Sequence, residues 1–280
     1  DSSTIEKKFA FSQAAAIIGV RMNTSLKDTW VFITGASAGV GAEGARHFAR
    51  EGAHVVLGAR RVERLEVVAA ECEAAGAAST HFKRLDVAST DSVNGVAHWL
   101  EGMTPKLDVL VNNAGGAHGM DTVAEGKDAD WDAMVQSNFL GLMRVTRACL
   151  PLMVENVGST IINIGSIAGR VAYEGGSVYC GVKAAEKQIT QSLRLELNGT
   201  GVRVGTLDPG LAETEFSLVR FKGDEAKSDK VYEGLDPLVA EDIAEAMVWM
   251  ATRPPHVCID EILIKCVAQA AVHKTHRATS

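Results

Sequence analysis

Three absences narrow what this 280-residue sequence can do. No apolar run near the start is long enough to cross a bilayer, because Ser12 and Gln13 interrupt the longest one, residues 9–20. Basic residues are outnumbered, 28 against 35 acidic ones, and the formal charge of −7 repels phosphate backbones and anionic lipid headgroups. We therefore expect neither a membrane nor a nucleic acid among the partners of this protein.

Cysteine is also scarce. The chain has five cysteines, an odd number, and none belongs to a C-x-x-C pair; they are Cys72, Cys149, Cys180, Cys258 and Cys266. This pattern indicates neither a disulfide framework nor a zinc site, and we predict no metal centre. A reducing compartment, the cytoplasm, fits it best.

The composition that remains is that of a folded, soluble protein. Hydrophobic residues make up 46% and charged residues 22% of the chain, close to the average for globular proteins. The length suffices for one large α/β domain or two small domains. Residues 1–25 carry no strong periodic pattern and are interpreted as a leader segment. We expect the folded domain over residues 26–265 and a C-terminal tail over residues 266–280.

From residue 30 onward, short apolar runs alternate with longer amphipathic stretches. The runs expected to form strands are 30–34, 54–58, 80–86, 109–112, 160–164, 202–207 and 259–263. The stretches expected to form helices are 41–51, 61–75, 89–99, 130–155, 177–198 and 240–251. This alternation predicts an α/β domain with a parallel sheet of about seven strands and helices on both faces. The segment 213–235 breaks the alternation and is expected to form a mobile lobe over the site.

A glycine-rich turn follows the first expected strand. Gly35, Gly39 and Gly41 have the spacing G-x-x-x-G-x-G and lead directly into the first expected helix. Such a turn lets the backbone approach a pyrophosphate group that sits on the positive N-terminus of that helix. The alternative is a turn whose glycines serve only the tight packing of the helix.

The end of the second expected strand distinguishes between two dinucleotides. A site for an unphosphorylated ribose has an acidic residue there, whereas this chain has Arg60 and Arg61. Two guanidinium groups suit a 2′-phosphate, so the sequence predicts NADP rather than NAD, unless both arginines merely begin a solvated helix. Asp86, after the third strand, is a candidate acceptor for the adenine amino group or else a turn residue.

Tyr179 and Lys183 lie four residues apart in the expected helix 177–198, so their side chains share one face. A free phenol loses its proton near pH ~10, too high for a base at neutral pH. A cation a few ångströms away favours the phenolate and brings it into the working range. On spacing alone, an exposed pair without a catalytic role remains the alternative.

Polar residues follow two further strands at the same edge of the predicted sheet. Ser166 comes just after the expected strand 160–164, where its hydroxyl can orient a substrate oxygen toward the phenol or cap a helix. Asn113 and Gly115 follow the fourth strand and are expected to line the same edge. Asn138, within a long apolar helix, either is surface exposed or holds backbone and water beside the lysine.

In their order and spacing, these motifs resemble the short-chain dehydrogenase/reductase family over about residues 26–265. The resemblance implies a single Rossmann-type, doubly wound domain that interconverts an alcohol and a carbonyl with NAD(P). It implies that Tyr179 is the acid/base and that Lys183 lowers the pKa of the phenol and binds the nicotinamide ribose. Ser166 would hold the reacting oxygen, and Asn138 would tie the lysine to a proton-relay water. Cofactor contacts are implied for Gly35, Ser37, Gly39, Val40, Gly41, Arg60, Arg61, Asp86, Val87, Asn113, Gly115, Tyr179, Lys183, Pro209, Gly210 and Thr214.

Segments 175–179 and 208–224 resemble a narrower group, the NADP-dependent 3-hydroxy acid dehydrogenases that also oxidise serine and allo-threonine. The likeness implies an NADP-dependent oxidoreductase for short 3-hydroxy acids, serine-like amino acids included. A carboxylate substrate needs a cation, and the candidates are Arg170 and Arg220, with solvated surface arginines as the alternative. The family also suggests a homo-oligomer, either a dimer or a tetramer.

Two other functions stay open at this point. A broad-specificity carbonyl or 3-ketoacyl reductase of the same family would prefer bulky ketones to small free acids. A non-catalytic protein that senses NADP(H) would keep the fold without turnover. The presence of Ser166, Tyr179 and Lys183 argues against the sensing protein.

Overall fold

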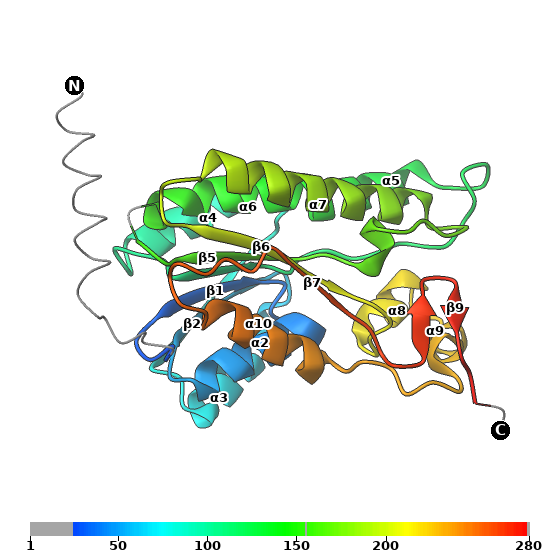
Figure 1. Cartoon of the computed structure of the whole chain (residues 1–280), viewed down its shortest axis with the longest axis horizontal. Helices are drawn as coiled ribbons and strands as arrows, with labels where there is room; N and C mark the ends of the chain where they lie inside the picture. Colours follow the sequence, from blue (N-terminus) through cyan, green and yellow to red (C-terminus); the bar gives the residue numbers. More distant parts are fainter. Residues whose placement is uncertain (1–24, 155, 279–280) are drawn as a thin grey trace.

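The computed structural model describes residues 25–154 and 156–278, and its centre is a seven-stranded parallel sheet (Figure 1). The strands are β1 (Trp30–Thr34), β2 (His54–Ala59), β3 (Ser79–Arg84), β4 (Val109–Asn112), β5 (Thr160–Ile164), β6 (Arg203–Pro209) and β7 (Glu261–Ile264). Their spatial order is β3-β2-β1-β4-β5-β6-β7. The order reverses between β1 and β4, which is the doubly wound arrangement expected from the sequence, and ligands bind at the carboxyl ends of the strands beside such a reversal.

Helices cover both faces of this sheet (Figure 1). One face carries α2 (Gly39–Arg50), α3 (Val62–Ala75) and α10 (Ala240–Ala251); the other carries α4 (Thr90–Glu101), α6 (Gly141–Cys149) and α7 (Ser177–Glu196). Side chains of β1 alternate between the two layers, with Val31 and Ile33 in one core and Phe32 in the other. The apolar runs of the sequence form strands because both faces of the sheet are covered.

The longest helix expected from the sequence is interrupted. Instead of one helix over 130–155, the chain forms α5 (Asp128–Met134), a π-helical turn η1 (Val135–Leu140) and then α6. A 3₁₀ turn, η2 (Leu150–Leu152), follows α6 and contains Pro151, which cannot continue an α-helix. The last predicted residue, Glu155, lies outside the described residues. The π-turn places Asn138 in the middle of the interruption.

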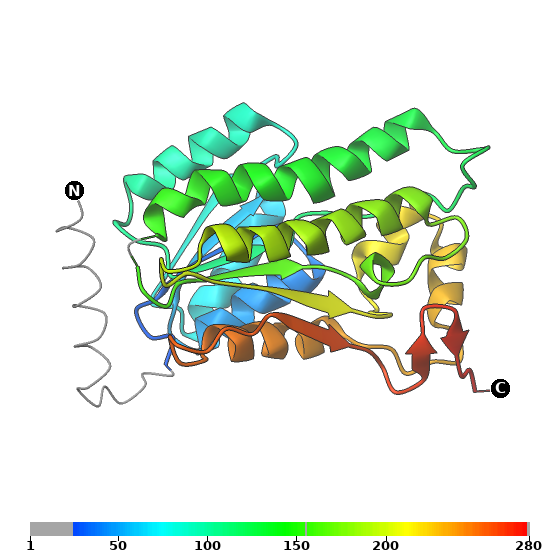
Figure 2. The same cartoon turned by 45° about the horizontal axis from the view of Figure 1, so that its top comes forward.

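The segment that breaks the alternation forms two short helices, α8 (Glu215–Arg220) and α9 (Glu225–Tyr232), at one end of the sheet (Figure 2). Residues after the last sheet strand form a small hairpin of β8 (Gln269–Ala271) and β9 (Lys274–Thr275) beside them. Of the expected leader, residues 1–25, only Ser25 belongs to the described residues. The last two residues of the expected tail, 279 and 280, also lie outside them. Within the described part of the chain, no helix has the length and apolar character needed to cross a membrane.

Candidate active site

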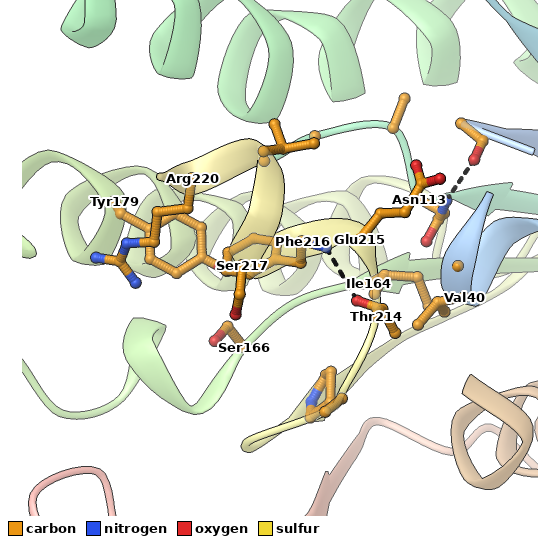
Figure 3. Close-up of a pocket in the computed structure, with 18 of the residues that line it drawn as sticks. Val40, Asn113, Ile164, Ser166, Tyr179, Thr214, Glu215, Phe216, Ser217 and Arg220 are labelled. Carbon is orange, nitrogen blue, oxygen red and sulfur yellow. Dashed lines mark hydrogen bonds between the residues drawn. The ribbon is translucent and has the colours of Figure 1, made fainter. Parts of the chain in front are cut away.

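A cavity of about 790 Å³ lies at the carboxyl ends of the sheet strands, between the sheet and the α8–α9 segment (Figure 3). It brings together residues that are distant in the sequence. The predicted site residues that line it are Gly35, Ser37, Gly39, Val40, Arg60, Arg61, Asp86, Val87, Asn113, Gly115, Ser166, Tyr179, Lys183, Pro209, Gly210, Thr214 and Arg220. Three predicted residues, Gly41, Asn138 and Arg170, are not part of its lining.

The glycine turn combines both roles considered for it. Gly35 and Gly39 line the cavity with φ angles of +67° and +53°, a backbone conformation that side chains rarely allow. A Cβ atom on Gly35 would lie 2.9 Å from the Ala114 Cα atom. At Gly41, a Cβ atom would lie 2.5 Å from the Gly35 carbonyl oxygen. Gly41 therefore serves the packing of the turn, whereas Gly35 and Gly39 shape the cavity wall.

The N-terminus of α2 opens onto this turn without a side-chain cap. Its N-cap residue, Ala38, offers no side-chain cap, and the first turn contains no acidic residue. The backbone N–H groups and the positive end of this 12-residue helix are thus open to an anion. A bare helix end with a glycine cradle fits the pyrophosphate of a dinucleotide.

Three residues line the cavity where the ribose of such a dinucleotide would lie, and we call them the ribose wall: Ser37, Arg60 and Arg61. The Arg61 guanidinium donates to the Ser37 hydroxyl at 3.1–3.2 Å, and Arg60 lines the cavity next to it. Arg61 also pairs with Glu215 of α8 at 3.0 Å, and Arg64 binds the other oxygen of the same carboxylate. Partial burial opposes it, but the two guanidinium groups leave the pKa of Glu215 below its usual value. This donor set fits a 2′-phosphate.

The end of β4 is tied to the glycine turn through Asn113. The backbone N–H groups of Asn113 and Ala114 each donate to the Thr34 hydroxyl at 3.0 Å. The Asn113 amide donates to the carbonyl oxygens of Thr34 and Gly35 at 3.0 and 3.2 Å. Figure 3 labels Asn113 and marks one hydrogen bond of its side chain. These contacts hold the cavity wall on both sides of the point where the strand order reverses.

Asp86 and Asn138 each bind the backbone. Asp86 accepts a hydrogen bond from the Ala88 N–H group at 3.0 Å, so it is a turn residue that also lines the cavity. Asn138 is 2% exposed, which makes the surface-exposed alternative wrong. Its amide donates to the Gly116 carbonyl oxygen at 2.9 Å and accepts from the Gly116 N–H group at 3.1 Å. In this structure, Asn138 holds the loop after β4 and makes no direct hydrogen bond to Lys183.

Helix α7 presents Tyr179 and Lys183 to the cavity on one face, and both side chains are largely buried. Ser166 lies opposite, at the start of a 3₁₀ turn, η3 (Ile167–Gly169), and its hydroxyl accepts from the Ala168 N–H group at 3.1 Å. The N-cap role considered for Ser166 is therefore real, and the same hydroxyl also borders the cavity. Three of the four catalytic residues implied by the family resemblance, Ser166, Tyr179 and Lys183, therefore face one space.

Lys183 has an ionic partner that the sequence motifs did not include. Its Nζ atom donates to the Ile164 carbonyl oxygen at 2.7 Å and to the Glu186 carboxylate at 2.8 Å. Burial lowers the pKa of Lys183, but Glu186 and Tyr179 outweigh burial and leave it above the ordinary value. Burial raises the pKa of Glu186 to about 7, although Lys183 opposes this.

Arg220 of α8 lies over two aromatic rings at the mouth of the site. Its guanidinium carbon is 5.7 Å from the centre of the Tyr179 ring and 5.3 Å from that of Tyr173. The Nε atom donates to the Gly119 carbonyl oxygen at 3.2 Å, whereas the buried Nη2 atom has no hydrogen-bond partner among the described residues. A buried, unpaired donor on a cation beside the phenol fits a small anion (Figure 3).

Arg170 is engaged elsewhere. Its Nε atom donates to Asp208 and its Nη2 atom to Glu261, both at 2.7 Å. Because it faces these carboxylates and does not line the cavity, the geometry does not support Arg170 as the substrate cation. The two arginines considered from the sequence are thus separated by the fold.

The cavity and near-cavity residues that were not predicted from sequence include Tyr173, Glu186, Glu215 and Phe216. Glu186 had a signal, because a charged residue three positions after Lys183 shares its helix face. Tyr173 and Glu215 had none, since their partners come from other elements. Burial raises the pKa of Tyr173 to about 12, with Arg220 opposing, so this second phenol stays protonated at neutral pH.

Comparisons with known proteins agree with this geometry. A family profile described as short chain dehydrogenase matches residues 29–224. Sulfoacetaldehyde reductase of Chromohalobacter salexigens is 46% identical over 242 residues, which cover 86% of this chain and 94% of that protein. NADP-dependent 3-hydroxy acid dehydrogenase of Schizosaccharomyces pombe is 42% identical over 248 residues, covering 88% of this chain and 96% of that protein. The closed form of serine dehydrogenase complexed with NADP+ is a solved structure with a TM-score of 0.83 and 40% identity, covering 89% of this chain and 100% of that one.

Proposed function

This chain belongs to the short-chain dehydrogenase family, and from that premise we propose that it is an NADP-dependent oxidoreductase that interconverts short 3-hydroxy acids, serine-like amino acids included, and their 3-oxo products. One observation carries the proposal. Arg220, with an unpaired buried donor, lies over the ring of Tyr179 within the cavity that also contains the dinucleotide cradle. A substrate held there would have its anion on the arginine and its oxygen at the phenol.

The chain's own residues divide the chemistry. Bound NADP supplies or accepts the hydride. Tyr179 exchanges a proton with the substrate oxygen, and Lys183 lines the same cavity one helical turn away on α7. The Ser166 hydroxyl, which can donate and accept, orients the reacting oxygen. Burial raises the pKa of the other nearby phenol, Tyr173, to about 12, which disfavours its phenolate.

The anion site also supports a second candidate reaction, the reduction of a small sulfonated aldehyde. The relative that is 46% identical is named sulfoacetaldehyde reductase. In sulfoacetaldehyde and in a 3-oxo acid alike, a single carbon separates the carbonyl carbon from the anionic group. Arg220 at a fixed place beside Tyr179 suits either substrate, since a guanidinium group binds both kinds of anion.

Cofactor choice follows from the ribose wall. Arg61 and Ser37 already meet there at 3.1–3.2 Å, and Arg60 stands beside them. A 2′-phosphate would receive charge-assisted hydrogen bonds from this group. A ribose without the phosphate would offer Arg60 and Arg61 no anion beyond Glu215, which already pairs with Arg61, and this supports NADP over NAD.

The test follows the absorbance of the reduced cofactor, with NADP+ or NAD+ for the alcohols and with NADPH or NADH for the carbonyl compounds. The alcohols are 3-hydroxypropionate, serine and the threonine isomers, and the carbonyl compounds are acetoacetate, sulfoacetaldehyde and simple ketones. We expect turnover with the phosphorylated cofactor and with small substrates that carry a carboxylate or sulfonate, and a loss of about 10²–10⁴-fold in Tyr179→Phe. Tyr173→Phe, which removes the other phenol near Arg220, should keep most of the rate.

Different outcomes favour different functions. Preference for bulky ketones over small acids would indicate a broad carbonyl or 3-ketoacyl reductase. Cofactor binding without turnover on the whole panel, unchanged by Tyr179→Phe, would indicate an NADP(H)-sensing protein. Preference for sulfoacetaldehyde over 3-oxo acids would select the second candidate reaction.

We further propose a cytoplasmic location and a homo-oligomer, either a dimer or a tetramer. All five cysteines are free thiols, and four of them are buried, which is consistent with a reducing compartment. Membership of the short-chain dehydrogenase family supports the homo-oligomer. Light scattering of the purified protein tests the oligomer.

A further inference from the structure

A buried carboxyl group stands directly behind Lys183. Glu186 lies one helical turn later on α7 and is 2% exposed. Its Oε2 atom accepts from Lys183 Nζ at 2.8 Å, and its Oε1 atom is buried with no hydrogen-bond partner among the described residues. Burying a carboxylate is costly unless a partner compensates it. This glutamate therefore has one strong interaction, the pair with the lysine.

Lys183 needs such a partner for two reasons. Its ammonium group has three N–H donors, of which one goes to the Ile164 carbonyl oxygen and one to Glu186. These two contacts fix the position of Nζ and leave the third donor for the cavity, which the lysine lines. Burial also disfavours the ammonium form, and the attraction of Glu186 is the leading effect that opposes burial.

The other groups that face Glu186 do not replace the lysine. From β6, Asp208 has like charge and adds to the rise in the pKa of Glu186. That aspartate is held by Arg170 at 2.7 Å and by the Thr206 hydroxyl at 2.6 Å. From β5, the contact to the pair is the neutral carbonyl group of Ile164. Lys183 is thus the cation that compensates Glu186, and Glu186 the anion that compensates Lys183.

We propose that Glu186 is a positioning residue that fixes the Lys183 ammonium group in place and keeps it charged, so that the lysine can act on the Tyr179 phenol. This role rests on the function proposed above. Glu186 does not line the cavity and acts through Lys183.

The role has a defined pH range. Burial raises the pKa of Glu186 to about 7, so the group is a carboxylate above that pH and a neutral acid below it. Removing its charge should therefore change the state of Lys183 above about pH 7. Below that pH, the wild-type protein and a variant with a neutral side chain should behave alike.

Three variants of the full chain separate charge from shape. Glu186→Gln keeps the shape and loses the charge, Glu186→Asp keeps the charge and shortens the side chain, and Glu196→Gln removes an exposed glutamate from the same helix as a control. Proton loss from Lys183 is followed by NMR in cofactor-free protein with ¹³C-labelled lysine, and the resonance is assigned by its disappearance in Lys183→Arg.

We expect the Lys183 titration midpoint to fall by about one to three pH units in Glu186→Gln. It should stay within about half a unit of wild type in Glu186→Asp and Glu196→Gln, because both keep the buried charge. The alkaline limb of the kcat/KM profile should move with the Lys183 midpoint. A purely structural role would lower the rate equally at every pH.

An unmoved midpoint in folded Glu186→Gln would overturn the proposal, as would an equal fall in Glu186→Asp. If Glu186→Gln does not fold, the wild-type midpoint decides. A midpoint at or above that of an ordinary lysine, about 10.4, supports compensation by Glu186, and one well below it contradicts compensation. A wild-type protein without turnover would count against the proposed function alone, because the NMR titration needs no reaction.

Discussion

The sheet with its helices and the lobe formed by residues 213–235 are held together by different forces. Helix α2 buries seven of its 12 residues, including the full side chain of Phe48. The lobe helices α8 and α9 each bury one residue, and in both it is a serine. The lobe is attached by the Phe216 ring, which packs against Tyr179, and by polar contacts such as those of Glu215 with Arg61 and of Lys222 with Asp130 at 3.0 and 2.7 Å.

This difference assigns separate tasks to the two regions. Apolar burial gives the sheet a rigid edge, and Tyr179 and Lys183 lie on a helix packed against it. Ion pairs between partly exposed groups are weak, so we expect the lobe to separate from the sheet at a lower cost than the helices that cover it. The lobe supplies Arg220, the group that would read the substrate anion. The residues proposed for the chemical step, Tyr179 and Lys183, thus belong to the sheet region. Arg220, the residue proposed to bind the substrate anion, belongs to the lobe.

The largest expected effect is a loss of stability when a buried side chain of the sheet region is shortened. Phe48→Ala removes a fully buried ring from α2 and should lower the free energy of unfolding by about 3–5 kcal/mol. Val219→Ala, on the exposed surface of α8, should change it by less than about 0.5 kcal/mol. Urea unfolding measures both values. Similar losses in the two variants would remove the energetic distinction between the regions.

A smaller effect is expected where the two regions meet. Arg61→Ala removes a guanidinium group from the ribose wall and should raise the KM for NADP by about 10–100-fold, with the KM for NAD nearly unchanged. Arg64→Ala is the matched control, because Arg64 binds the same Glu215 carboxylate but does not line the cavity. Equal losses in both variants would mean that the arginines act through Glu215 and not on the cofactor.

The smallest effect concerns the attachment of the lobe. Glu215→Gln weakens its ion pairs with Arg61 and Arg64, which are partly exposed, and should change global stability by less than about 1 kcal/mol. Amide hydrogen exchange in α8 and α9 should become faster, while exchange in the sheet strands stays unchanged. High salt should reduce the difference from wild type. Unchanged exchange in the lobe would show that other contacts hold it.

The sequence predicted the sheet well because its five inner strands are buried on both faces. All seven expected runs became parallel strands, since continuous apolar runs such as that of β1 have few other ways to be buried. The interruption of this helix was not predicted, because it depends on a contact between distant residues. Asn138 in the π-turn binds the backbone of Gly116, more than 20 residues earlier in the chain. Helix periodicity does not report such a contact.

The residues of the candidate site also fall into two groups, those that the sequence predicted and those that only the fold could place. Motifs whose residues are close in the sequence, such as the glycine turn and the pair of Tyr179 and Lys183, were placed together by local geometry. Arg170 and Arg220 looked equivalent, and only the fold directs one to Asp208 and the other over the phenol. Contacts between separate elements decide such cases, and spacing along the chain does not encode them.

The central claim is that the loosely held lobe presents Arg220 to the substrate anion beside Tyr179. The most direct test compares the kcat/KM of wild type and Arg220→Met for acetoacetate and for its uncharged analogue acetoacetamide, with NADPH. We predict that Arg220→Met lowers the value for acetoacetate by about 10–100-fold and leaves that for acetoacetamide within about threefold. Equal losses for both compounds, or no loss for acetoacetate, would contradict it.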